Sequence, residues 1–277
     1  MSAAAQRAPR DKLVLLGICS DANSSFLPGA AQAPALIRAA LYSGSANLTS
    51  ETGVCLGDDD CVVDLGDTSF EGTPAGLMAI EPHVAAALGE GRLPLVLGGD
   101  HAITYPIVRA LARRHGPLNI LHFDAHPDLY DELDGNRLSH ACPFARIMEE
   151  GLAERLVQVG IRSLNAPQRT QAGRFGVEIH EMRSFDVASF DPDLSAPVYL
   201  SFDMDALDPA FAPGVSHFEP GGLSVRDVIT IIHRVEARVV GADIVEYNPR
   251  HDHYSMTAMV GAKLVKEIGG VMLRNGE

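Results

Sequence analysis

Cysteine, basic residues and long apolar runs are scarce in this sequence. Four cysteines stand among 277 residues and form neither a CxxC pair nor a disulfide-dense pattern, which predicts reduced packing residues in a cytosolic protein. No apolar stretch approaches the roughly 20 residues of a membrane span, so no membrane association is expected. The 22 Lys and Arg are outnumbered by 36 Asp and Glu, and the net charge of −14 argues against nucleic acid as a partner. A small cationic substrate suits this charge.

No linker, low-complexity tract or internal repeat divides the chain, so a single domain over residues 1–277 is expected. The composition, 46% hydrophobic and 21% charged, is that of a globular protein with a large core. Residues 1–11 lack the apolar segment of a signal peptide and are expected to form a flexible tail. No organellar transit segment is apparent, and a cytoplasmic location is the simplest expectation.

Short apolar runs alternate with amphipathic stretches along nearly the whole chain. The runs are continuously apolar, as in strands that are covered on both faces. Strands are predicted at 12–19, 61–65, 93–97, 118–123, 156–160, 198–202 and 239–245. Helices are predicted at 33–41, 77–88, 103–114, 142–150, 224–237 and 254–268. This alternation predicts one parallel sheet between helix layers, and such sheets bind ligands beyond the carboxyl ends of their strands.

Residue types that bind metals follow three of the predicted strands. They lie in the segments G-G-D-H, D-A-H-P-D and D-M-D, and they are His101, Asp124, His126, Asp128, Asp203 and Asp205. Alternate residues of an extended segment share a side, so each group can point to one place above the sheet. Each fragment taken alone also fits a turn, a helix cap or a structural histidine.

Taken together, these side chains predict two metal ions. Four carboxylates in one site would repel each other strongly without a counterion. Two divalent cations balance their charge, and oxygen-rich ligation with some imidazole suits Mn²⁺ better than tetrahedral Zn²⁺. Such a centre can hold a water between the ions, lower its pKa and direct the resulting hydroxide at an electrophile, which is the chemistry of a hydrolase.

Two further residues indicate what is hydrolysed. Glu246, in G-A-D-I-V-E-Y-N-P, follows the last predicted strand, and its carboxylate matches the planar donor fork of a guanidinium; a helix cap or a surface ion pair is the alternative. His140, in the loop D-G-N-R-L-S-H-A, has a side chain suited to passing a proton to a leaving amine; a plain surface histidine is the alternative. No other histidine gains a catalytic role from its spacing alone.

The segments G-G-D-H, D-A-H-P-D, S-F-D-M-D-A-L-D-P and E-Y-N-P together resemble the ureohydrolases, the family of arginase, agmatinase and related guanidino hydrolases. The resemblance runs from about Leu13 to Leu264. It implies a three-layer α/β/α sandwich with a central eight-stranded parallel sheet, two Mn²⁺ per chain and a homotrimer or homohexamer. The segments N-S-S-F-L-P-G, Y-D-E-L-D-G-N and G-V-S-H-F-E-P-G-G-L-S resemble the plant-type arginases in particular.

The resemblance also implies roles for the residues singled out above. The six metal-binding candidates would be the ligands, and Asp128 would in addition accept a proton from the bridging water. His140 would be the proton shuttle and Glu246 the guanidinium-binding residue. Donors for the far end of the substrate are expected in two loops, and the candidates are Asn23, Ser25, Asn136 and Ser139.

The leading expectation is an enzyme of arginine metabolism that cleaves L-arginine to L-ornithine and urea through a metal-bridging hydroxide. Cleavage of agmatine to putrescine and urea, or of another guanidino acid, is the alternative, because these substrates share the guanidinium and differ at the far end. A catalytically silent metal-binding regulator is a further alternative. A zinc-dependent deacetylase type would need one metal, so the metal stoichiometry separates it from a two-metal hydrolase.

Overall fold

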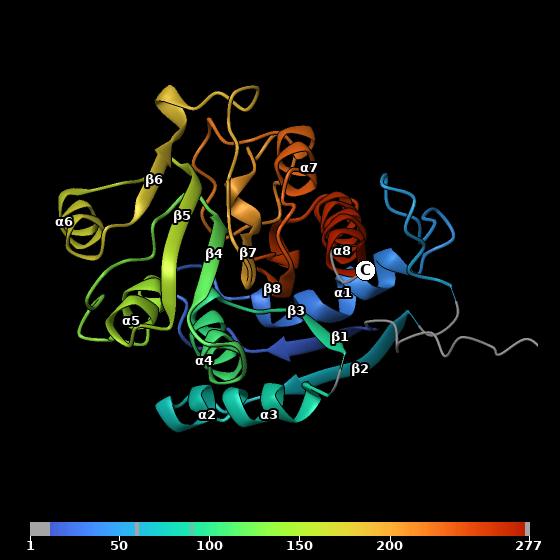
Figure 1. Ribbon diagram of the computed structural model, residues 1–277, viewed down its shortest axis with the longest axis horizontal. Coiled ribbons are helices and arrows are strands. Elements are labelled where there is room, and N and C mark those ends of the chain that lie inside the picture. Colours follow the sequence, from blue (N-terminus) through green and yellow to red (C-terminus); the bar gives the residue numbers. More distant parts are fainter. Residues whose placement is uncertain (1–11, 59–60, 90, 275–277) are drawn as a thin grey trace, which may run out of the picture.

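The computed structural model describes residues 12–58, 61–89 and 91–274, which form an eight-stranded sheet covered by helices (Figure 1). The tail expected at 1–11 lies outside the described residues. The strands are β1 Lys12–Cys19, β2 Val62–Ser69, β3 Arg92–Leu97, β4 Leu118–Phe123, β5 Ala153–Ile161, β6 Glu178–Glu181, β7 Val198–Asp203 and β8 Val239–Val245. Their order is β2-β1-β3-β8-β7-β4-β5-β6, and every neighbouring pair is parallel.

Helices cover both faces of the sheet. They are α1 Ala33–Leu41, α2 Pro74–Met78, α3 Ile80–Ala87, α4 Thr104–His115, α5 Pro143–Glu149, α6 Ala166–Phe175, α7 Val225–His233 and α8 Met256–Arg274. In Figure 1, α1, α7 and α8 lie on one side of the sheet, and α3, α4 and α5 lie on the other. The structure thus confirms the predicted three-layer α/β/α sandwich with an eight-stranded parallel sheet.

Burial of both faces explains the continuous apolar runs. Successive residues of a strand point to opposite faces, and in β1 Leu13 and Leu15 belong to the core under α1, α7 and α8. Val14 and Leu16 belong to the core on the α3, α4 and α5 side. A strand in this position therefore needs apolar side chains at every residue.

The structure differs from the expectation at three elements. α6 has no apolar stripe, and its buried residues are Gln168 and Ala172. β6 is a four-residue edge strand with half-buried side chains. Neither has the pattern of a core element, so the sequence did not reveal them. The helix expected at 77–88 is divided into α2 and α3, because Pro82 has no N–H to donate to the carbonyl of Met78, one turn earlier.

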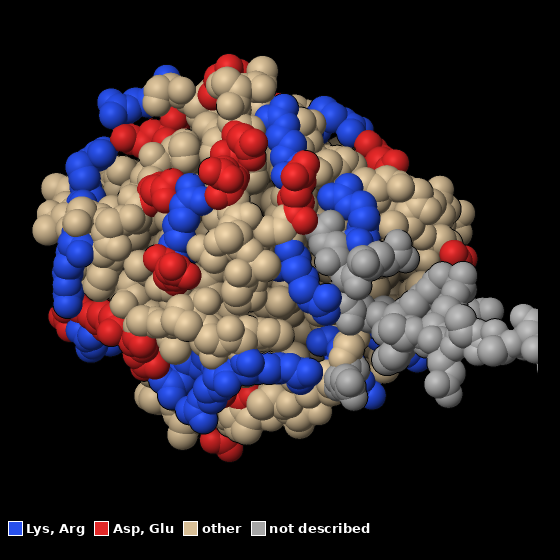
Figure 2. All heavy atoms as spheres, viewed as in Figure 1, with Lys and Arg blue, Asp and Glu red and all other residues tan. Residues whose placement is uncertain are grey.

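The surface carries mixed charge. On the face shown in Figure 2, acidic and basic side chains of the described residues lie interspersed rather than separated by sign. Several form ion pairs, such as Arg155 with Glu178 and Arg226 with Glu51. None of the helices in the described part of the chain combines the length and the apolar character that a membrane span requires.

Candidate metal centre

The carboxyl ends of β3, β4 and β7 bring the six predicted ligands together. Nδ1 of His101 lies 3.2 Å from Asp124 Oδ2, 3.1 Å from Asp128 Oδ2 and 3.2 Å from Asp203 Oδ2. These four residues come from the carboxyl ends of three strands that lie near one another in the sheet, in the order β3-β8-β7-β4. One cluster of possible metal ligands is therefore centred on His101.

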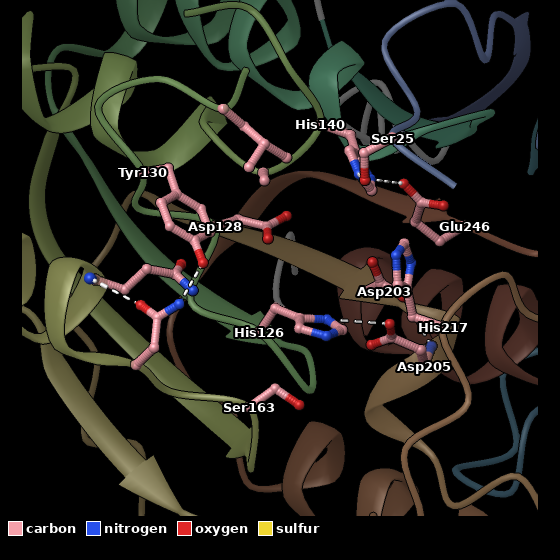
Figure 3. A pocket seen from close by; sticks show the side chains of 14 residues that line it. Ser25, His126, Asp128, Tyr130, His140, Ser163, Asp203, Asp205, His217 and Glu246 are labelled. Carbon is pink, nitrogen blue, oxygen red and sulfur yellow. Dashed lines mark hydrogen bonds and ion pairs between the residues drawn. The ribbon is translucent and has the colours of Figure 1, made fainter. Parts of the chain in front are cut away.

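A second cluster lies beside the first and shares Asp124 with it. Asp124, His126 and Asp205 place one ligand atom each within 4.8 Å of one another. His126 Nδ1 is 3.4 Å from Asp124 Oδ1 and 3.2 Å from Asp205 Oδ2, and Figure 3 shows the His126 ring directed at Asp205. One oxygen of Asp124 faces each cluster, so this carboxylate could contribute to holding a metal ion at either one.

The atoms of the first cluster fit a bound cation. His101 is fully buried, and its Nδ1 has no hydrogen-bond partner, although three carboxylate oxygens surround it. A buried nitrogen without a partner is costly. A divalent cation bound by this nitrogen and the three oxygens satisfies all four groups, which is the arrangement of a metal site.

The buried carboxylates of the two clusters also favour the binding of positive charge. Burial disfavours the protonated form of His101 and His126, yet the surrounding carboxylates outweigh burial and raise the pKa of both imidazoles well above its usual value. Burial and the neighbouring carboxylates raise the pKa of Asp203 and Asp205. Protons are thus drawn to the places where metal ions would otherwise supply the charge.

His122 was not singled out in the sequence, yet it contacts Asp124. Gln158 Nε2 donates to the carbonyl of Pro127 at 2.7 Å, which fixes the orientation of the amide, and its other hydrogen points to His122 Nδ1 at 3.0 Å. His122 Nδ1 is thus the acceptor, and Nε2 carries the hydrogen that Asp124 Oδ2 accepts at 2.9 Å. Burial lowers the pKa of His122, so the ring is a neutral donor that orients Asp124 rather than a ligand.

Strained backbone holds two of the predicted site residues. Asp128 has φ of 50° and Glu246 has φ of 63°, in the left-handed region that side chains rarely adopt. The Glu246 N–H donates to the carbonyl of Gly99 at 2.9 Å. A Cβ atom on Gly99 would lie 1.7 Å from the carbonyl oxygen of Ser20, so only glycine allows the chain to pass here. The G-G-D-H segment therefore positions Glu246 as well as His101.

Glu246 and His140 form a buried ion pair beside the two clusters. His140 Nδ1 lies 2.9 Å from Glu246 Oε1, and His140 Nε2 lies 2.8 Å from the hydroxyl of Ser25 (Figure 3). Burial disfavours the charged imidazole, but Glu246 outweighs that effect and raises the pKa of His140 to about 9. His140 is therefore protonated at neutral pH, with a hydrogen to give.

A cavity of about 290 Å³ opens above these side chains. Its wall contains residues of both clusters and the ion pair, and the predicted site residues among them are Ser25, His126, Asp128, His140, Asp203, Asp205 and Glu246. His101 and Asp124 are fully buried below it. The arrangement can place a small cationic molecule between a carboxylate, a proton donor and the two clusters of possible metal ligands.

Three residues that were expected at the substrate end do not line the cavity. The side chain of Asn136 accepts the N–H of Leu138 inside its own turn, and Ser139 is buried, with its hydroxyl near the N–H of Ala141. Asn23 acts through its backbone, because its carbonyl accepts the His140 N–H and its N–H donates to Asp100. The polar groups expected to bind a substrate thus form hydrogen bonds within the protein instead.

Other polar residues line the cavity instead. They are Tyr130, Ser163, Asn165, Gln168 and His217. The hydroxyl of Tyr130 accepts a hydrogen from Asn165 Nδ2, and Asn165 Oδ1 caps α6 by accepting the N–H of Gln168. Asn before Ala-Pro is a helix-start signal. This signal would have predicted a helix that begins at Ala166, with Ser163 and Asn165 between it and the carboxyl end of β5.

The fold and the site define a metal-dependent hydrolase of the α/β/α type, with room for two ions under one cavity. The family model described as the arginase family matches residues 11–270. The chain belongs to the arginase family. The resemblance seen in the sequence, to the ureohydrolases and to plant-type arginases in particular, is confirmed.

Several relatives are named as arginases. A mitochondrial arginase 1 from Arabidopsis thaliana is 52% identical over 272 residues, which cover 92% of this chain and 79% of that protein. A mitochondrial arginase 1 from Oryza sativa subsp. indica is 50% identical over 270 residues, covering 92% and 79%. The solved structure of the arginase from Medicago truncatula has a TM-score of 0.89 and 43% identity, and the match covers 96% of this chain and 89% of that one.

These comparisons contradict the expected cytoplasmic location. The Arabidopsis and rice relatives are both named as mitochondrial, which points away from a purely cytoplasmic protein. The expectation rested only on the absence of a recognisable targeting pattern. Such an absence carries no physical information about where a folded hydrolase resides.

Proposed function

We propose that this chain hydrolyses L-arginine to L-ornithine and urea with two Mn²⁺ ions. The observation that carries the proposal is one cavity that joins both carboxylate–histidine clusters to the His140–Glu246 ion pair. A guanidinium is planar and cationic and needs a carboxylate partner. Cleavage of its carbon–nitrogen bond needs an activated water and a proton donor. The cavity brings these three requirements together.

The donor set of the two clusters suits manganese. Four carboxylates and two imidazoles supply it, and we propose as ligands His101, Asp124, His126, Asp128, Asp203 and Asp205. Oxygen-rich ligation with some imidazole favours Mn²⁺ over tetrahedral Zn²⁺. When bound, two such cations lower the pKa of a water molecule and polarise the group that it attacks.

Glu246 is proposed to hold the guanidinium. Both bonds that it accepts go to Oε1, from the backbone N–H of His101 and from His140 Nδ1, each at 2.9 Å. Its Oε2 takes part in neither bond. That oxygen is therefore free to accept N–H groups of the substrate, and the strained backbone of Glu246 fixes its direction.

His140 and Asp128 are proposed to move protons. His140 carries the hydrogen that a departing amine needs, and its contact with Ser25 keeps Nε2 at the cavity wall. Asp128 also lines the cavity, and its Oδ2 lies 3.1 Å from His101 Nδ1. We propose that this carboxylate accepts a proton from the attacking water. In this proposal His140 is the general acid and Asp128 is the general base.

The outer wall favours arginine over agmatine. Arginine differs by its α-carboxylate, which needs hydrogen-bond donors. Asn165 Nδ2 donates one of its two hydrogens to the Tyr130 hydroxyl and keeps the other for a substrate. Because Tyr130 is the acceptor in this bond, its own hydroxyl hydrogen can be donated to a substrate as well. Ser163 adds a third hydroxyl or amide donor to the wall. A site with such donors rejects a substrate that leaves them unsatisfied.

Urea release in the presence of Mn²⁺ tests the proposal, with arginine, agmatine, guanidinobutyrate and guanidinopropionate compared at equal concentration. Arginine is expected to have the highest kcat/KM. Asn165→Asp is a matched variant, because it keeps the oxygen that caps α6 and replaces the amide donor by an acceptor. It should lower kcat/KM for arginine while agmatine hydrolysis is unchanged or improved. Equal losses for the two substrates would refute the role of Asn165 at the carboxylate end.

We further propose that the chain is a single catalytic domain and that identical copies assemble as a trimer or hexamer. The family resemblance supports both statements. The eight strands in one sheet support a single domain. Sedimentation equilibrium of the Mn²⁺-loaded protein measures the assembly, and a monomer at micromolar concentration would contradict it.

A further inference from the structure

Four polar residues lie in one row across the sheet, below the metal centre. Gln158 of β5 pairs with His122 of β4, His122 pairs with Ser201 of β7, and Ser201 pairs with Asp243 of β8. All four are fully buried. Burying polar groups between strands is costly unless each is hydrogen-bonded. The direction of those bonds therefore indicates what the row does.

Asp243, at the β8 end of this row, accepts three hydrogen bonds, one of them from its neighbour Ser201. Ser201 Oγ donates to its Oδ1 at 2.8 Å. Thr104 Oγ1 at 2.7 Å and the Tyr199 hydroxyl at 2.6 Å donate to its Oδ2. Both carboxylate oxygens are thus acceptors, and each receives at least one hydroxyl hydrogen.

The bond from Ser201 to Asp243 determines which nitrogen of His101 carries hydrogen. A serine hydroxyl has a single hydrogen, and here it points to Asp243. The oxygen of Ser201 lies 3.0 Å from His101 Nε2, so it must accept from that nitrogen. Nε2 then bears the hydrogen, and the lone pair is left on Nδ1. Nδ1 is the atom that faces Asp124, Asp128 and Asp203.

We propose that Asp243 is a positioning residue of the metal centre: through Ser201 it holds the hydrogen of His101 on Nε2 and leaves Nδ1 free to bind a metal ion. The inference rests on the proposed two-metal function, because only a metal ligand requires the lone pair at Nδ1. Asp243 does not line the cavity, so it acts through His101 rather than on the substrate.

Asp243→Asn reverses the direction of this chain of hydrogen bonds. The asparagine carbonyl takes the place of Oδ2 and accepts from Thr104 and Tyr199. Its NH₂ then donates to Ser201, whose hydrogen turns to His101 Nε2. The hydrogen of the imidazole moves to Nδ1, where a metal must displace it. Such changes behind a ligand usually weaken metal binding by about 10- to 100-fold.

Two variants separate this role from packing. Tyr199→Phe removes a hydroxyl from the same carboxylate but keeps the bond from Ser201, so Mn²⁺ binding should stay close to that of the parent protein. Ser201→Ala removes the connecting hydroxyl and keeps Asp243, so it should weaken Mn²⁺ binding as Asp243→Asn does. If Asp243→Asn does not fold, Ser201→Ala against Tyr199→Phe carries the same test.

The experiment titrates each full-length protein with Mn²⁺ against a competing chelator and measures bound metal by elemental analysis. Asp243→Asn is expected to bind one of its two ions about 10- to 100-fold more weakly than the parent. The midpoint of thermal unfolding, measured without metal, records any loss of packing separately. Unchanged affinity in Asp243→Asn or in Ser201→Ala, or an equal loss in Tyr199→Phe, would overturn the role of Asp243.

The parent protein in the same titration separates this inference from the proposed function. If it binds two Mn²⁺ and the Asp243→Asn variant matches it, only the hydrogen-bond relay is wrong. If the parent binds no Mn²⁺, the metal centre itself is refuted, and the role of Asp243 is refuted with it.

Discussion

Replacing Glu246 by glutamine removes one negative charge from the cavity and keeps the size of the side chain. Glu246 is 4% exposed, and its Oε1 accepts from the His101 N–H and from His140 Nδ1. A glutamine carbonyl can keep both bonds, which turns its NH₂ toward the position proposed for the guanidinium. A donor then faces a donor, so a charge-assisted pair is replaced by repulsion.

The expected magnitude follows from the burial of this carboxylate. Losing one partner of a buried, hydrogen-bonded charge pair costs about 2–5 kcal/mol, which is a decrease in kcat/KM of about 30-fold to several thousand-fold. Steady-state urea release from arginine measures this decrease.

The pH dependence of the reaction tests the same ion pair. The acid His140 must be protonated to act, so kcat/KM should fall as the pH rises through its pKa of about 9. Because Glu246 raises that pKa, Glu246→Gln should move this fall to lower pH.

A second buried glutamate provides the control. Glu267 on α8 is fully buried and pairs with a histidine, since its Oε2 lies 2.8 Å from His233 Nε2, but it does not line the cavity. Glu267→Gln should lower thermal stability and leave kcat/KM unchanged. The reasoning is refuted if Glu246→Gln keeps more than about a tenth of the parental kcat/KM, a cost below roughly 1.4 kcal/mol, while its metal content is intact.

Three further predictions concern the metals, the proton donor and the substrate. Exhaustive chelation should abolish urea release and lower the midpoint of thermal unfolding, because the carboxylates of the centre lose their counterions. Added Mn²⁺ should restore both activity and stability. Full turnover in metal-free protein would contradict the two-metal proposal. His140→Asn should lower kcat by about 10²- to 10⁴-fold with unchanged metal content, and loss of metal would instead make His140 a ligand. A kcat/KM for agmatine that exceeds the value for arginine tenfold would overturn the choice of arginine and leave a guanidino hydrolase.

Local spacing was sufficient to predict seven of the eight strands of the described residues and the six metal-ligand candidates. Strands β4 and β8 and helix α1 have the predicted bounds, because continuous apolar runs and one-sided apolar stripes depend only on nearby residues. Asp124, His126 and Asp128 stand together because they follow one strand at alternate positions. α6 and β6 lack such patterns, and so they were not predicted.

Long-range pairing decided the details of the site. His140 meets Glu246 across 106 residues of sequence and Ser25 across 115. No local pattern reveals either contact, since both depend on the order of the strands. The same holds for Asn136 and Ser139, whose residue types suit a substrate but whose polar groups close turns.

The amino-acid sequence by itself thus determined the kind of chemistry, because residue type and short spacing fix which side chains follow each strand. Only the tertiary structure decided where their hydrogens lie. The row from Gln158 through His122 and Ser201 to Asp243 exists because four parallel strands are paired in one register. A shift of one residue in any of these strands would turn its polar side chain to the other face of the sheet. Register is a property of the folded sheet, and it places the hydrogen-bond partners that orient the ligands of the metal centre.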